Sequence, residues 1–423
     1  MANVADVAPV PGQTQAEPPT RTSIRGLFAQ TEIDLRLFGM LVALVVILLT
    51  FHVLSGGKLI SPTNMVSMAI QATGIAIIAT GMVLVIVSRN IDLSVGSLAG
   101  LIAMVYALLM TNWLTAIGIG VDFPFRWVIA LLIGVGVGAL VGGVQGFIIA
   151  YIGVPSFVVT LGGLLSIRGA IYYLSNGAAV SGLDPDFQKI GGGGDGSIGG
   201  PLTWALGIIG CVAIVALLIN GRRQRRRYGF PLRPMWAEVM LAVVGCAIVL
   251  GLALFANNNF LARSQTPAGF PDPIVLLIVV TLVMTFIANR RRFGRYVYAY
   301  GGNPDAAELA GINTRWTILK TYVLMGILCA LAGAVASARL NGATLDVGQS
   351  YELYVIAAAV VGGTSFAGGI GTIPGAVLGA FVMQALAYGL SFLNVISPGQ
   401  NIAVGVVLIV AVGLDTYNRR RGS

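Results

Sequence analysis

The run PIVLLIVVTLVMTFIA (residues 273–288) contains no charge, and the polar stretch NRRRFGRYVYAYGGNPDAAELAGINTRWTILK (Asn289–Lys320) follows it directly. The same alternation of apolar runs and short polar stretches continues through most of the chain. Hydrophobic residues make up 57% of the sequence and charged residues only 10%, with a mean hydropathy of +0.88. Soluble domains carry about 25% charged residues. The sequence therefore predicts an integral membrane protein.

Twelve apolar segments are candidates for spanning helices, each of which needs about 20 predominantly apolar residues. They cover residues 37–54, 65–87, 93–112, 127–151, 155–175, 202–219, 236–256, 273–288, 318–338, 353–367, 374–395 and 400–416. Glycine or polar residues interrupt the segments at 93–112 and 353–367. We therefore predict an all-α, polytopic membrane helix bundle of 10–12 transmembrane helices.

The distribution of basic residues predicts the orientation. With the N-terminus inside, 19 of the 25 Lys and Arg residues fall on the cytoplasmic side, as the positive-inside rule requires. Both termini are then cytoplasmic. We expect a disordered, Pro-rich tail over residues 1–34, a membrane domain over 35–417 and a basic C-terminus over 418–423. Because the arginines lie between apolar runs, the net charge of +9 does not indicate nucleic-acid binding.

Catalytic and nucleotide-binding motifs are absent from the sequence. A phosphate-binding loop needs a Gly-Lys-[Ser/Thr] ending, and none of the three lysines (Lys58, Lys189, Lys320) follows a glycine in that way. The glycines at 191–194 are interpreted as part of a flexible external loop, Asn176–Pro201. A single histidine, His52, supports no catalytic cluster, and we expect no cofactor and no metal site. The chain must draw energy from elsewhere.

The polar stretch carries the signals of a short capped helix on the cytoplasmic face. Asn303 is placed to cap it and Pro304 to begin it, with acidic residues in the first turn and Gly311 at the end. Such a helix is suited to contacting a partner protein. Its predicted contact residues are Asp305, Ala306, Ala307, Glu308, Leu309, Ala310 and Gly311.

Two polar breaks interrupt apolar runs, one in each half of the chain. They are SRNIDLSVGS (Ser88–Ser97) and GGTSFAGGIGTIPG (Gly362–Gly375). Paired breaks of this kind point to the functional centre of a transporter. The alternative is that both are ordinary turns between helices, with Asp92 capping the next helix. Arg89 and Asp92 are three residues apart, which would suit an ion pair on a helical turn.

Three motifs together resemble a known family. NIDLSVGS (Asn90–Ser97), GRYVYAYGGNPDAAELAGI (Gly294–Ile312) and AAVVGGTSFAGGIGTIPGAVLGA (Ala358–Ala380) are similar to segments of the permease subunits of bacterial ATP-binding-cassette (ABC) importers for ribose, xylose and galactose. The resemblance implies a permease homodimer in the inner membrane, two ABC ATPase subunits and a periplasmic sugar-binding protein. Residues 294–316 then correspond to the coupling segment that docks on the ATPase.

Two features depart from the ribose-type pattern. Arg89 and Asn90 stand where small residues usually precede the first motif. An additional apolar pair near 202–256, joined by the basic loop Arg222–Pro234, resembles the xylose-type branch. This makes xylose the first candidate among monosaccharide substrates.

Polar side chains inside the apolar segments are candidates for the sugar pathway, because amides and hydroxyls can exchange hydrogen bonds with sugar hydroxyls. Hydrogen bonding between helices is an equally good explanation for each one alone, and Arg168 is interpreted as extending to the outer interface. The candidate pathway residues are Gln71, Asn90, Asp92, Ser94, Gln145, Thr160, Thr364, Ser365, Phe366 and Gln384.

An ion-coupled secondary sugar transporter is the alternative function. It would need carboxylates within the membrane to bind the coupling ion. Asp92 is the one acidic candidate that the sequence places near the interior of a span.

Overall fold

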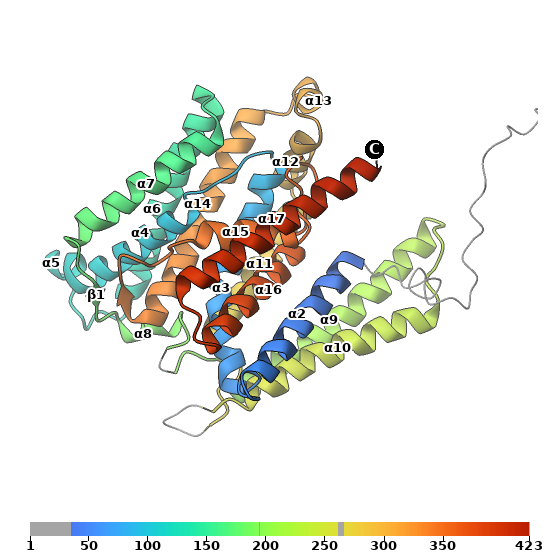
Figure 1. Ribbon diagram of the computed structural model, residues 1–423, viewed down its shortest axis with the longest axis horizontal. Helices are drawn as coiled ribbons and strands as arrows, with labels where there is room; N and C mark the ends of the chain where they lie inside the picture. The colour runs from blue at the N-terminus through green and yellow to red at the C-terminus, as the bar shows by residue number, and fades with distance from the viewer. Residues whose placement is uncertain (1–34, 194, 261–265, 423) are drawn as a thin grey trace, which may run out of the picture.

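The computed structural model describes residues 35–193, 195–260 and 266–422 and is almost entirely helical (Figure 1). Ten helices in this part of the chain are long and apolar enough to cross a membrane. They are α2 (Leu35–Leu54), α3 (Pro62–Val87), α4 (Val95–Leu108), α6 (Arg126–Phe147), α7 (Ser156–Ser175), α9 (Gly199–Arg227), α10 (Met235–Asn257), α11 (Asp272–Arg290), α14 (Thr314–Leu340) and α16 (Ile373–Phe392). A π-helical turn (Leu109–Trp113) and α5 (Leu114–Ala116) extend α4, and a second π-helical turn (Ile148–Ile152) extends α6.

Two further apolar helices complete the bundle, so the prediction of 10–12 helices is confirmed. They are α15 (Tyr351–Val361) and α17 (Ser397–Gly422). The expected span at 353–367 is wrong, because α15 has 11 residues and rises only about 16 Å, roughly half of a hydrocarbon core. The predicted tail at 1–34 lies outside the described residues. Residues 418–422 continue α17.

Helices α3 and α4 form the centre of the bundle. Their apolar windows are each 89% buried, whereas those of α2, α9 and α10 are 11% buried. Helices α9 and α10 pack mainly against each other, and Figure 1 shows them as a hairpin beside the main body. A helix that is apolar all round and buried within protein belongs to the core. One with the same composition and an open surface suits contact with lipid.

Small residues allow α6 and α14 to approach closely. Gly138 on α6 faces the carbonyl oxygen of Gly326 on α14, and a Cβ atom at either position would collide with the other backbone. Gly142 meets the carbonyl of Tyr322 one turn further along. This is the small-residue packing by which membrane helices associate without a hydrophobic driving force.

The two ends of the bundle carry different polar structures (Figure 1). At one end lie α12 (Arg292–Gly302) and α13 (Pro304–Leu309). The other end carries α8 (Pro185–Lys189) and the antiparallel pair of β1 (Val180–Ser181) with β2 (Gly342–Ala343). The loop expected at Asn176–Pro201 therefore contains a strand and a short helix, and its Gly191 packs against the end of α14.

Candidate functional site

Helix α13 forms as the sequence predicts. Asn303 caps it, and its side chain accepts a hydrogen bond of 3.0 Å from the backbone N–H of Ala306. Pro304 occupies the first turn, where its missing N–H costs nothing. Gly311 has a φ of +79°, and its N–H donates to the carbonyl of Glu308, which ends the helical path. The cap, the start and the stop are all confirmed.

The exposed face of α13 offers an apolar side chain surrounded by acidic ones. Leu309 is 90% exposed, so almost its whole side chain is available to a partner. Ala307 differs from the expected set of contact residues, because it is 4% exposed and anchors α13 to the rest of the protein. The members of the predicted set that remain available to a partner are Asp305, Ala306, Glu308, Leu309, Ala310 and Gly311.

Helix α12, which the sequence reasoning missed, attaches this segment to the bundle. Its buried residues Gly294, Val297 and Gly301 lie on one face, at the spacing of three and four that marks an amphipathic helix. The Tyr298 hydroxyl donates a 2.8 Å hydrogen bond to the carbonyl of Gly371. Burial raises the pKa of Tyr298 to about 12, so the phenol stays a neutral donor at physiological pH.

Arg89 joins the first break to the end of α12. Its Nε donates to the carbonyl of Gly301 at 2.8 Å and its Nη2 to the carbonyl of Gly302 at 2.9 Å. A cation at the C-terminus of a helix satisfies free carbonyls and complements the helix dipole. The predicted pair of Arg89 with Asp92 is wrong, because residues 88–94 are not helical and the two side chains have different partners.

The second break, residues 362–372 between α15 and α16, reaches the same place. The N–H of Gly369 donates to the carbonyl of Val87 at 3.0 Å. Gly301 lies against that same carbonyl so closely that a Cβ atom could not fit. Both predicted breaks are therefore real interruptions of helices, and the end of α12 touches each of them.

Inside the bundle, the first break carries a compact polar network. Asp92 Oδ1 accepts a 2.9 Å bond from the Ser94 N–H and a 2.7 Å bond from the Ser94 hydroxyl. The Ser94 hydroxyl lies 3.0 Å from Gln145 Oε1 on α6. Asp92, Ser94 and Gln145 are 2%, 0% and 6% exposed. The expectation that Asp92 caps the next helix is wrong, because Ser94 is the N-cap of α4. Asp92 instead organises the turn just before α4 through its two bonds to Ser94.

Helices α7 and α14 hold the same break from the other side. The Ser156 hydroxyl oxygen accepts a bond of 3.3 Å from the Ile91 N–H. The hydroxyls of Thr160 and Tyr322 donate to the Ile91 carbonyl at 3.3 and 3.4 Å. Thus the structure brings Asp92, Ser94, Gln145 and Thr160 of the predicted pathway set into one cluster around the break.

The other predicted pathway residues lie elsewhere. Gln71 on α3 and Gln384 on α16 meet through a 3.3 Å side-chain hydrogen bond. Asn90 bonds locally to the Ser88 carbonyl. Thr364, Ser365 and Phe366 belong to the second break, where the N–H of Ser365 donates to Ile370 and Phe366 packs on the core.

Arg168 has definite partners inside the protein, and its extension to the outer interface stays a prediction. Its Nη1 donates to the carbonyls of Leu345 and Val347 at 2.9 and 3.1 Å. The side chain therefore fastens the segment after β2. The sequence could not show this, because residue 168 and residue 345 are far apart along the chain.

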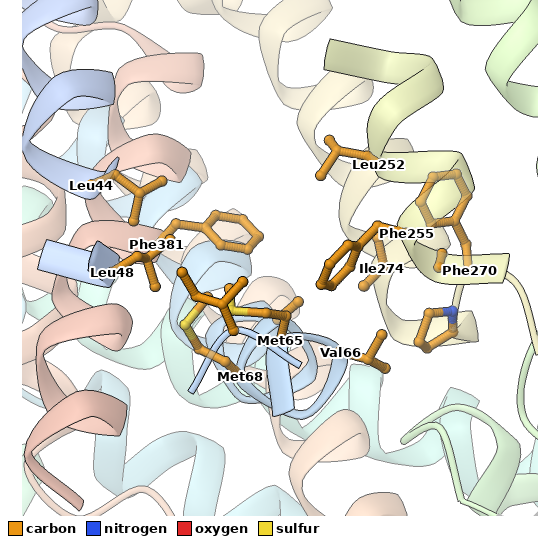
Figure 2. Close-up of a pocket in the computed structure, with 14 residues that line it drawn as sticks. Leu44, Leu48, Met65, Val66, Met68, Leu252, Phe255, Phe270, Ile274 and Phe381 are labelled. Carbon is orange, nitrogen blue, oxygen red and sulfur yellow. The ribbon is translucent and has the colours of Figure 1, made fainter. Parts of the chain in front are cut away.

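An apolar cleft of about 340 Å³ lies between α2, α3, α10, α11 and α16 (Figure 2). Figure 2 shows Leu44 and Phe381 on one wall, Leu252 and Phe255 on the other, and Met68 between them. All of its lining side chains are apolar. A sugar could not exchange its hydrogen bonds with water for others here, so this cleft is not a sugar site.

Ten apolar helices, two interrupted helices and a polar segment bonded to both interruptions define a membrane transport component. Residues 64–412 match the family model described as the permease component of branched-chain amino acid transport systems, and the chain belongs to this family. It is a multi-pass inner-membrane protein that serves as the transport subunit of its system and not as an enzyme.

Individual relatives match over most of their length. The chain is 36% identical to the xylose transport system permease protein of Escherichia coli over 97% of this chain and 98% of that protein. It is 35% identical to the protein of the same name in Haemophilus influenzae over 93% and 100%. Identity to the ribose import permease protein of Escherichia coli is 31%, over 89% and 92%. No solved structure matches.

Proposed function

We propose that this chain is the membrane-spanning permease of an ATP-driven ABC importer for a monosaccharide, with xylose as the first candidate. Permease relatives named for xylose, galactose and ribose cover nearly the whole chain, at 29–36% identity. The xylose permeases match over 93–97% of this chain, and the galactose and ribose permeases over 89–90%. The higher identity to the xylose permeases supports xylose as the first candidate.

The observation that carries the proposal is the connection between α13 and the breaks. Helix α13 presents Leu309 outward, while the adjacent end of α12 bonds to Arg89 and touches Gly369 through Val87. A partner that binds Leu309 and moves α13 therefore displaces both interrupted helices. An ABC ATPase on the cytoplasmic face is the partner that such a segment requires in a chain without a nucleotide-binding loop.

Energy transfer then follows from the rigidity of the contacts. Gly301 has no space to slide against Val87, and the guanidinium of Arg89 holds two consecutive carbonyls. Displacement of α13 moves α12 as a body and shifts the ends of α3 and of the second break with it. Packed interfaces change between discrete arrangements and do not deform continuously, which suits alternating access.

The full transporter in this proposal contains a second permease copy, two ATPase subunits and a periplasmic sugar-binding protein. The predicted orientation supports it, because it places the basic Arg290–Arg295 region and α13 on the cytoplasmic side. It also places β1, β2 and α8 outside, where a binding protein delivers sugar. The low burial of α2, α9 and α10 leaves helix surface for lipid and for the second copy.

The ion-coupled alternative has less support. Asp92, the carboxylate that the sequence offers for this role, accepts both of its short bonds from Ser94 and is 2% exposed. No group of three or more potential metal-ion ligands exists among the described residues. Family membership through residues 64–412 points to a subunit that works with partners.

The test is transport in a defined system. The chain is reconstituted in proteoliposomes with its co-expressed ATPase and binding protein, and uptake of radiolabelled D-xylose, D-ribose and D-galactose is measured. We expect uptake of at least one sugar that requires ATP at the α13 face and persists when ion gradients are collapsed. Uptake that survives without ATP and is lost with the ion gradient would establish the alternative.

A further inference from the structure

A polar pocket of about 210 Å³ lies at the end of α14 that is furthest from α13. Arg339, Thr344, Asp346 and Tyr351 supply its polar lining. None of these four residues belongs to the pathway set that the sequence predicts. The pocket is smaller than the roughly 300–1,000 Å³ of sites that hold drug-sized ligands. Its size suits a single sugar ring.

The pocket is built on a fixed segment, residues 341–350. Asn341 and Ser350, at its two ends, both have left-handed backbone, with φ of +49° and +63°. The Asn341 side chain accepts a 2.8 Å bond from the Leu183 N–H, beside the β1–β2 pair. Non-glycine residues hold such conformations only where the surroundings impose them, and they gather at functional sites.

Helices α4 and α7 hold the middle of the segment. Gly348 (φ +75°) packs against the backbone of Gly96 on α4 with no room for a side chain. Arg168 on α7 bonds the carbonyls on both sides of Asp346, those of Leu345 and Val347. The position of the Asp346 backbone is therefore set before any ligand arrives, which lowers the entropic cost of binding.

Four charged side chains lie in this region without forming ion pairs with one another. They are Arg168, Arg339, Asp346 and Glu352. Arg168 lies close enough to Asp346 and Glu352 for electrostatic interaction. Even so, the two ion pairs within 4.0 Å among the described residues are Lys189 with Asp186 and Arg222 with Glu238, both elsewhere. Glu352 Oε2 is buried with no hydrogen-bond partner. Arg339 and Asp346 are exposed at this end of the bundle, so an arriving ligand can reach both charges.

An uncharged polyol matches this lining. A sugar hydroxyl donates and accepts at once, so one ring can donate to the Asp346 carboxylate and accept from the Arg339 guanidinium. Bonds to charged groups are about twice as strong as neutral ones. Neither side chain has a hydrogen bond to another described side chain. A hydrocarbon ligand would leave both charges unsatisfied.

Polar groups continue inward from the pocket between α3 and α16. Arg339 lies near Tyr351 and Tyr388, and Tyr388 lies beside Ser67 on α3. One turn deeper, Gln71 and Gln384 form their hydrogen bond. Positions 67 and 71 share one helix face, as do 384 and 388. The two faces form a line of uncharged polar groups that begins at the pocket.

We propose that this pocket is the site that first receives the monosaccharide on the side opposite α13, with Asp346 and Arg339 as its recognition groups and Gln71 and Gln384 next along the path. The inference rests on the proposed function and adds the place of entry. A loop of the sugar-binding protein is the competing occupant of the pocket.

The experiment compares Asp346→Asn, Arg339→Gln and Thr344→Val in the reconstituted transporter. Asp122→Asn, an exposed change of equal charge in the loop before α6, is the control. We measure uptake of D-xylose, D-ribose and D-galactose, and separately the affinity of the permease complex for the sugar-binding protein. We expect the first two variants to lose uptake by about tenfold or more, the effect of one bond to a charged group. Thr344→Val should lose less, and affinity for the binding protein should stay within twofold.

The outcomes separate the possibilities. Wild-type uptake by Asp346→Asn and Arg339→Gln overturns the inference and leaves the proposed function intact. Loss of uptake together with weaker attachment of the binding protein also overturns it, because the pocket then receives a protein loop. The two charge variants are measured separately, so the one that folds decides the matter if the other fails to fold. A wild-type protein that takes up none of the three sugars with ATP refutes the proposed function itself.

Discussion

Arg89 is the residue through which we expect the coupling segment to move the first break, and Arg89→Ala tests this directly. Its Nε bond to Gly301 is partly buried and its Nη2 bond to Gly302 is exposed. A buried bond to a charged group contributes about 1.5–3 kcal/mol, and solvent weakens the exposed one. We therefore assign the pair about 1–3 kcal/mol of local stability between α12 and the break.

Hydrogen exchange measures that local stability. Loss of about 1–3 kcal/mol should speed amide exchange in residues 292–312 by about 5–150-fold, while exchange in α3 and α4 stays unchanged. Sugar uptake per ATP hydrolysed should fall, because α13 then moves without the break. Arg295→Ala is the matched control. Arg295 is an exposed arginine on α12, and it does not reach the break.

Arg89→Gly separates the side chain from the backbone. Arg89 has a φ of +61°, which costs a non-glycine residue about 1–2 kcal/mol. The glycine variant should therefore be more stable to heat than the alanine variant but equally fast in exchange over residues 292–312. Wild-type exchange and wild-type coupling in both variants would refute the reasoning.

Three other substitutions test the remaining contacts. Gly301→Ala places a Cβ against the Val87 carbonyl, so we expect at least a tenfold loss of uptake, or loss of folded protein on size-exclusion chromatography. Ser94→Ala removes the hydroxyl bonded to Asp92 and lying beside Gln145, and thermal unfolding in detergent should show a loss of about 1–3 kcal/mol. Leu309→Arg changes a side chain that is 90% exposed. Co-purification of the ATPase should fall at least tenfold with an unchanged melting temperature, and normal co-purification would contradict the role of α13.

Local signals in the sequence predicted local structure well. Asn303, Pro304 and Gly311 fixed the bounds of α13, because caps and turn residues act within a few positions of themselves. Hydropathy placed the helices, since backbone groups in lipid must bond within their own helix. It failed at 353–367, because residues 362–367 belong to the second polar break, which the structure leaves non-helical.

The candidate site was less predictable, because its bonds join distant parts of the chain. Arg89 reaches Gly301, and Arg168 reaches Val347, and no pattern in one sequence reports such pairs. The amphipathic spacing of Gly294, Val297 and Gly301 is a local signal that could have predicted α12. Arg168 stood out as a charge inside an apolar segment, but nothing near it in the sequence indicates its partners.

Helix α3 connects the two ends of the proposed mechanism. Its last residue, Val87, contacts Gly301 and accepts the bond from Gly369, while its first half carries Ser67 and Gln71 of the inward polar line. The helix is continuous over 26 residues, with no proline beyond its first turn, and its apolar window is 89% buried. A continuous, close-packed helix transmits a displacement at one end to the other as a rigid element. The contacts of α13 with its partner can therefore alter the spacing of α3 and α16 at the pocket end without any bond between the two sites.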